Sequence, residues 1–141
     1  MEVQEKKLGR VFRLEFKKGE DFFAEVSRFA REKGIREASI FMIGAMGEGQ
    51  VVTGFLSSQE GDSNRRPLGM KREFLALGTL TWPASRPRAV QEPAPWHEPQ
   101  PYPHLHLALG PDIGEEQKEI LVGHLNKGLA IGLTAHLYEL L

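Results

Sequence analysis

Two histidines separated by one residue carry the clearest chemical signal in this sequence. His104 and His106 stand in the segment PHLHLAL, residues 103–109, whose apolar residues predict a β-strand. Because strand side chains alternate between faces, both imidazoles lie on one face of the strand and the leucines on the other. Imidazoles held side by side on a rigid strand are typical ligands of a transition-metal ion.

A third imidazole, His124, follows in Gly123-His124-Leu125. Together with His104 and His106 it would supply three neutral nitrogen ligands, which with one water form an open tetrahedral zinc site. The alternative is that His104 and His106 are surface histidines on a solvent-facing strand, and that His124 is a turn histidine bonded to a backbone carbonyl. A cupin-type metal site is disfavoured because no glutamate follows the histidine pair.

The remaining two histidines are weaker candidates. His97 and His136 could serve as extra ligands or as hydrogen-bond partners of the ligands. The simpler interpretation places His97 in a loop beside Trp96 and His136 on the polar face of the last strand. Neither residue is therefore included in the predicted ligand set.

Other catalytic chemistries have little support. The chain has no cysteine, which excludes disulfides, thiolate nucleophiles and cysteine-ligated zinc, and it has no Gly-x-Ser-x-Gly elbow. The glycine-rich residues 44–49 precede a predicted strand, whereas a phosphate loop needs a helix there. Glu73 and Glu139 are the acids nearest strand ends, and a glutamate could act as general base for a metal-bound water.

Composition indicates one soluble domain. The chain has 141 residues, 40% of them hydrophobic, and a formal net charge of −1, so its overall field does not attract nucleic acid or anionic membrane. The charged start does not resemble a signal peptide, and no apolar run is long enough to span a bilayer. We expect a cytoplasmic protein without a membrane partner, with a flexible N-terminus over residues 1–8 and a domain over 9–141.

The hydrophobic pattern predicts one main helix among strands. The helix begins after Gly19-Glu20-Asp21 and ends near Gly34. Glycine-rich residues 44–49 predict a bulged connection, residues 57–69, 110–112 and 123–128 predict turns, and residues 83–103 predict a long loop with seven of the nine prolines. This gives an α+β fold with about seven largely antiparallel strands. The strands are expected over residues 11–16, 38–43, 51–56, 74–80, 104–109, 120–122 and 131–138.

Six short segments in the same order resemble one known family. They are Gly19-Glu20-Asp21, residues 40–45 (IFMIGA), residues 72–80 (REFLALGTL), His104-Leu105-His106, Gly123-His124-Leu125 and Leu133-Thr134-Ala135. This ordered set resembles the PPC domain (plants and prokaryotes conserved domain) from about residue 11 to the end of the chain. The set is specific, although no single segment is.

The resemblance implies an α+β domain that assembles as a homotrimer. Stand-alone prokaryotic members of that family are described as predicted DNA-binding proteins, and some hold zinc at the histidines matching His104, His106 and His124. In plants the domain follows an AT-hook, but residues 85–88 (SRPR) lack the Arg-Gly-Arg core of that element and no other segment supplies it. The family also often has glutamate at the position of His136 and a shorter loop before the histidine strand.

Three functional hypotheses follow. The first is a zinc-holding homotrimeric domain with a DNA-associated or regulatory role and no clear catalysis. The second is a metal-dependent hydrolytic enzyme acting on a small molecule, with residues 83–103 as a lid. The third is a structural trimer whose histidines only form hydrogen bonds. If DNA binds, we expect contacts from the basic residues Arg65, Arg66, Lys71, Arg72, Arg86 and Arg88.

Overall fold

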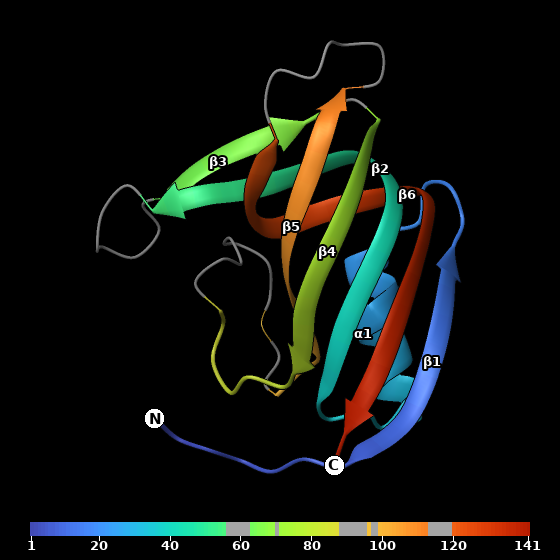
Figure 1. The fold of residues 1–141 in the computed structure, drawn as a ribbon, viewed down its shortest axis with the longest axis vertical. Helices are drawn as coiled ribbons and strands as arrows, with labels where there is room; N and C mark the ends of the chain where they lie inside the picture. The colour runs from blue at the N-terminus through green and yellow to red at the C-terminus, as the bar shows by residue number, and fades with distance from the viewer. Residues whose placement is uncertain (56–62, 70, 88–95, 97–98, 113–119) are drawn as a thin grey trace.

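The computed structural model describes residues 1–55, 63–69, 71–87, 96, 99–112 and 120–141. These residues form one helix and six strands, and all strand pairs are antiparallel (Figure 1). The elements in chain order are β1 (Leu8–Phe16), α1 (Phe22–Lys33), β2 (Ala38–Phe55), β3 (Ser63–Leu68), β4 (Arg72–Thr81), β5 (Tyr102–Asp112) and β6 (Leu121–Leu140).

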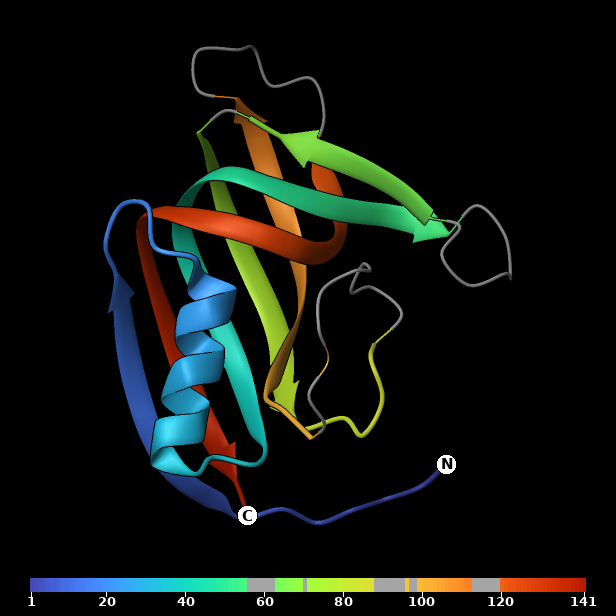
Figure 2. The same cartoon turned by 180° about the vertical axis from the view of Figure 1, so that it is seen from behind.

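The six strands form one strongly curved sheet in the order β1-β6-β5-β4-β2-β3. Strand β6 bends, so that Leu121–Leu125 pair with β5 while its later residues pair with β1 and β2. The pairings β6–β5, β5–β4, β4–β2 and β2–β6 thus close on themselves, as in a small barrel. Figure 2 shows α1 packed across one side of this sheet.

The helix is confirmed where the sequence predicted it, because both of its ends are fixed by local signals. The Asp21 side chain accepts hydrogen bonds from the backbone N–H groups of Phe23 and Ala24, at 3.0 and 3.2 Å. Gly34 ends the helix with φ 67°, a left-handed conformation that favours glycine. Between these caps, Phe22, Val26 and Ala30 are buried against the sheet.

The core lies between α1 and the inner face of the curved sheet. Alternate residues of each strand point into it, as the period of two requires. Its largest fully buried side chains include Phe22, Met42, Leu80, Leu105, Leu109 and Leu137. The outer face of β4 is exposed at Glu73, Leu75, Leu77 and Thr79.

The described residues form six strands where about seven were predicted, because four predicted strands belong to two long ones and β3 was not predicted. Residues 38–43 and 51–56 were expected to be separate strands, yet residues 38–43 and 51–55 both lie in β2, whose pairing with β6 shifts register between Ala45 and Val51. Residue 56 lies outside the described residues. The irregularity agrees with the predicted bulge. Gly44 has φ 140°, and a Cβ there would overlap the backbone oxygen of Gly132, so glycine here permits a close strand contact.

Two predicted turns were wrong, and a third was wrong over its described part. The turn over residues 123–128 and its flanking strands, apart from Ile120, are part of β6, and residues 110–112 belong to β5. Residues 63–68 of the polar segment 57–69 form β3, while residues 57–62 lie outside the described residues. Strand β5 also begins at Tyr102, inside the predicted loop over 83–103. Glycine and proline marked these positions as breaks, but cross-strand pairing overrides such local preference.

Parts of the predicted loops fall outside the described residues, including Arg88 and His97. Among the described residues, no helix has the length and apolar character needed to cross a membrane.

Candidate metal centre

Strand β5 presents His104 and His106 on one face, as the sequence predicted. Leu105, between them, is fully buried in the core, which fixes the strand in the orientation that turns both imidazoles outward. The Nε2 atoms of the two rings are 3.2 Å apart. The pair is therefore already held at hydrogen-bonding distance.

Strand β6 brings His124 to the same place. His124 is the cross-strand partner of His106 in the β5–β6 ladder, where directly opposed side chains are neighbours. Only 8% of His124 is exposed, whereas His104 and His106 are open to solvent. His124 lies within β6 and not at a turn, and it pairs with both β5 and β2.

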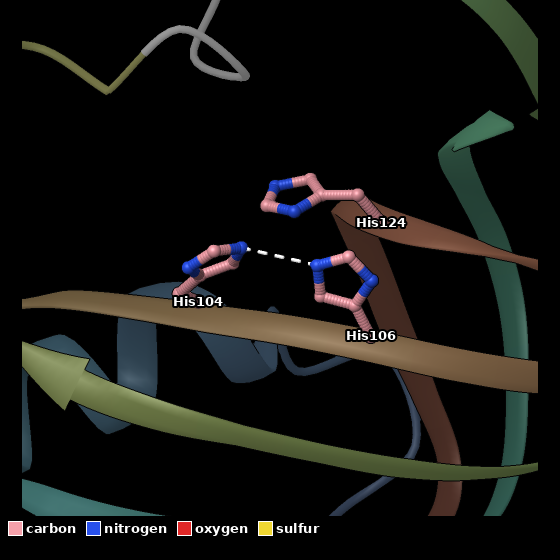
Figure 3. A group of neighbouring side chains, drawn as sticks. All are labelled: His104, His106 and His124. Carbon is pink, nitrogen blue, oxygen red and sulfur yellow. Dashed lines mark hydrogen bonds between the residues drawn. The ribbon is translucent and has the colours of Figure 1, made fainter. Parts of the chain in front are cut away.

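The three rings converge on one point above the sheet (Figure 3). Their centroids are 5.1 Å apart for His104–His106, 4.7 Å for His104–His124 and 5.3 Å for His106–His124. One nitrogen from each ring lies within 4.8 Å of one nitrogen from both others. In tetrahedral zinc sites, Zn–N bonds of about 2.1 Å hold the nitrogens about 3.4 Å apart. The three side chains thus fit an ion after only small rotations.

The surroundings of the triad favour neutral imidazoles. Burial, and then the neighbouring His106, lower the pKa of His104. Burial lowers the pKa of His124 to about 4, helped by the charges of His104, His106 and Arg65. Since a metal binds the lone pair of a neutral imidazole, these two ring nitrogens do not have to lose a proton to become ligands at neutral pH. Within the described residues, no carboxylate joins the cluster.

Tyr102 is a member of the site that the sequence analysis missed. Its hydroxyl lies 3.1 Å from Nε2 of His124, and its ring packs between Trp96 and His104 with centroid distances of 6.1 and 6.0 Å. Burial raises its pKa to about 12, so the phenol is neutral at physiological pH. The positions 102, 104 and 106 share one strand face, and this period of two could have identified it, had Pro101 and Pro103 not indicated a loop.

The other acid and histidine candidates do not join the triad. His136 lies on β6 opposite Arg13 of β1 and Phe41 of β2, outside the cluster. The carboxylate of Glu139 accepts hydrogen bonds from the backbone N–H, Nε and Nη2 of Arg10, at 3.1, 2.7 and 2.7 Å. That residue therefore joins β1 to β6 and is not placed to act as a general base.

Five of the six basic residues named as a possible DNA contact lie in the part of the chain that the structure describes, and Arg88 does not. Arg65 and Arg66 lie on β3, which forms one end of the strand order. Arg72 begins β4 and donates a hydrogen bond from Nη1 to the backbone oxygen of Gly110 at 3.0 Å. Arg72 therefore also has a structural role.

The fold is shared with several solved structures. A plant- and prokaryote-conserved (PPC) protein from Pyrococcus horikoshii has a TM-score of 0.76 and 22% identity, over 100% of this chain and 85% of that one. A protein from Archaeoglobus fulgidus described as metal-containing has a TM-score of 0.73 and 23% identity, over 99% and 86%. A predicted DNA-binding protein from Bacteroides thetaiotaomicron has a TM-score of 0.66 and 20% identity, over 95% and 82%.

No match is found among curated protein sequences. Residues 3–138, nearly the whole chain, match the Plants and Prokaryotes Conserved (PCC) domain, which is the PPC domain that the six ordered segments resembled. The chain therefore belongs to the plants and prokaryotes conserved domain family.

Proposed function

We propose that this protein is a cytoplasmic, homotrimeric, zinc-holding domain with a DNA-associated or regulatory role. His104, His106 and His124 are the ligands, and the ion is zinc or another divalent transition metal. The observation that carries the proposal is the convergence of three imidazoles from two paired strands, with nitrogens within 4.8 Å of one another. A protein from Archaeoglobus fulgidus with the same fold is described as metal-containing, which supports a metal ion in this fold.

A homotrimer would explain an unusual surface. The outer apolar face, defined here as Ile43, Leu75, Leu77, Ile120 and Val122, consists of side chains that are between 46% and 63% exposed. Ile43 pairs with Leu75, Leu75 with Ala108, and Ala108 with Val122, so the face runs without a break across β2, β4, β5 and β6. Soluble monomers rarely leave such a continuous apolar surface open, and burial against further copies of the chain would cover it.

The metal site adjoins this face. Leu77 is the cross-strand partner of His106, and His106 is the partner of His124, so the triad forms the next row of the same surface. An open groove of 710 Å³ lies on the outer apolar face itself, lined by residues that include Ile43, Leu75 and Ile120. Copies packed on the outer apolar face would therefore bring subunit boundaries close to the ion.

The test is elemental analysis of the purified protein combined with its mass in solution. We expect one equivalent of metal per chain after incubation with zinc and desalting, and a particle three times the chain mass of 15.8 kDa. A protein that retains no stoichiometric metal would disprove the zinc site. A monomeric particle would disprove the homotrimer separately.

A hydrolytic metalloenzyme is the second candidate, favoured by one observation. Three protein ligands leave a coordination position for water, as in catalytic zinc sites, whereas structural zinc sites are closed by four protein ligands. Spectroscopy of the cobalt-substituted protein distinguishes the two. An exchangeable water that is replaced by added azide supports the enzyme, and a spectrum unchanged by azide supports a closed structural site.

A further inference from the structure

The hydroxyl of Tyr102 contacts one of the two ring nitrogens of His124. An imidazole has two ring nitrogens, and in the neutral ring one carries a proton while the other has a lone pair. Nε2 of His124 lies 3.1 Å from the hydroxyl of Tyr102 and is therefore occupied by that hydrogen bond. In Figure 3 the His124 ring stands over the gap between His104 and His106, with one nitrogen turned toward them and the other turned away.

The other two histidines approach the centre in a different way. The atoms of His104 and His106 that face each other are both Nε2, 3.2 Å apart. An ion between these two atoms therefore meets Nδ1 of His124 as its third ligand. The resulting set is mixed, with two Nε2 ligands from β5 and one Nδ1 ligand from β6.

Binding through Nδ1 requires a specific protonation state of His124. When Nδ1 gives its lone pair to the ion, the proton of the neutral ring is on Nε2, and Nε2–H needs an acceptor. The oxygen of Tyr102 is at the right distance to accept it. Its ring is held by contacts with Trp96 and His104, so the oxygen cannot move away freely.

We propose that Tyr102 is a positioning residue for the metal. Its hydroxyl accepts the Nε2–H of His124, fixes the tautomer and the rotation of that ring, and directs Nδ1 to the ion. Hydrogen bonds of this kind between a ligand imidazole and a second residue orient the ligand and raise its basicity. The inference rests on the proposed metal site, and it adds a residue and a coordination mode to that site.

The variant Tyr102→Phe tests this with little disturbance of packing. It removes one oxygen and keeps the aromatic ring between Trp96 and His104. We expect the zinc affinity, measured by competition with a chromophoric chelator, to fall by about 10- to 100-fold, the usual cost of losing such a partner. The melting temperature of the metal-free protein should change little. Tyr138→Phe is the matched control, since Tyr138 is the only other tyrosine and belongs to the part of β6 that pairs with β1.

Nitrogen-15 NMR of the histidine rings gives a second, direct measurement on the unmodified protein. In the zinc-loaded wild type we expect His124 to show a metal-bound Nδ1 and a protonated Nε2, and His104 and His106 to show metal-bound Nε2. In Tyr102→Phe the Nε2 proton of His124 should exchange faster with solvent. Coordination of His124 through Nε2, or a Tyr102→Phe variant that binds zinc as tightly as the wild type, would overturn the role of Tyr102 alone. A wild-type protein that binds no zinc would overturn the proposed function together with this inference.

Discussion

Nε2 of His104 and Nε2 of His106 are 3.2 Å apart, and a hydrogen bond between them needs one nitrogen to carry a proton and the other to keep its lone pair. The lone pair of the accepting nitrogen therefore faces the space that the three imidazoles surround. An ion bound in that space would take the place of this proton and would use the lone pairs of all three rings. The same geometry would thus serve as a hydrogen-bonded cluster without metal and as a ligand set with it.

Removal of one imidazole should abolish tight binding. We expect His124→Ala to lower zinc affinity by more than the roughly 100-fold that loss of an outer partner can cost, because a direct ligand is removed. The matched control is His136→Ala, which removes a β6 histidine outside the cluster. Chelator competition on both variants provides the measurement. Equal affinities for the two variants would contradict the assignment of His124 as a ligand.

The buried carboxylate of Glu139 should make the metal-free protein sensitive to acid. Hydrogen bonds from Arg10 hold its pKa at about 2, below the ordinary value of 4.5. Between these values the unfolded chain binds a proton that the folded chain does not, so the free energy of unfolding decreases as the pH falls from 4.5 toward 2. His124 adds a second pH dependence at higher pH, between its ordinary pKa of 6.5 and its folded pKa of about 4. In this range too, the free energy of unfolding decreases as the pH falls.

Glu139→Gln isolates this contribution, because glutamine is similar in size but does not titrate. We expect the difference in unfolding free energy between wild type and variant to be largest above pH 4.5 and to shrink toward pH 2. Urea unfolding of the metal-free proteins at several pH values measures it. A difference that stays constant across this range would show that the Arg10–Glu139 pair does not depend on the charge of the carboxylate.

At the scale of elements, the ladder between β4 and β5 sets the position of two of the three imidazoles. Gly78 of β4 pairs with Leu105, the residue between His104 and His106. A Cβ at Gly78 would overlap the backbone oxygen of His104. Because a backbone atom cannot rotate away as the end of a side chain can, the strands themselves would have to move apart. The strand that carries the histidines can therefore keep its place only if residue 78 is glycine.

Gly78→Ala should consequently affect both stability and the metal site. We expect a loss of about 1–3 kcal/mol in unfolding free energy, the usual cost of forcing an extra group into a packed region, together with weaker zinc binding. Gly69→Ala is the control, because a Cβ there meets nothing within 4 Å. Urea unfolding and chelator competition measure the two effects. Unchanged zinc binding in a destabilised Gly78→Ala variant would mean that β5 does not position the site through this contact.

Elements whose ends are fixed by residues close to them in the sequence could be predicted from the sequence. The helix has its own caps, Asp21 and Gly34, so its bounds were correct. The long strands could not be predicted, because glycines inside β2 and β6 resemble breaks to a local analysis. Only the cross-strand contacts, such as that of Gly44 with Gly132, explain why the chain continues through them.

In the candidate site, too, the features set by residues close in sequence could be predicted, and those set by strand pairing could not. The shared face of His104 and His106 follows from the period of two along a single strand. The position of His124 depends on the β5–β6 register, which places it opposite His106, and spacing along the chain does not contain that information. The family resemblance supplied it as an expectation. Tyr102 was missed because prolines on both sides gave its segment the composition of a loop.

At the scale of the whole molecule, the outer apolar face should control assembly. We expect Leu75→Asp to dissociate the proposed trimer into monomers, because it places a charge in the middle of a surface that further copies would bury. Leu75 is already 49% exposed, so the monomer should stay folded. Light scattering with circular dichroism provides the measurement, and Val3→Asp, outside the sheet, is the control. A trimer that tolerates Leu75→Asp would show that another surface holds the copies together.

The dependence of binding on salt concentration tests the DNA association in the proposed role. The net charge of −1 gives no general attraction to phosphate, so binding must come from a local group such as Arg65 and Arg66 on β3. A homotrimer would present this pair three times. Repetition raises the apparent affinity of individually weak contacts when all copies can reach the same duplex.

We therefore expect duplex DNA to bind at low salt, with an affinity that falls steeply as the salt concentration rises. The slope of log affinity against log salt concentration should be about −0.9 for each phosphate contact. Arg66→Ala should make that slope less steep, because a phosphate contact is lost. Arg31→Ala, which removes a charge from the last turn of α1, should leave the slope unchanged. Fluorescence anisotropy of a labelled duplex at two salt concentrations measures both effects. Because sequence-independent phosphate binding is weakest at high salt, absence of binding even at low salt would exclude a direct DNA contact and leave a regulatory role through protein partners.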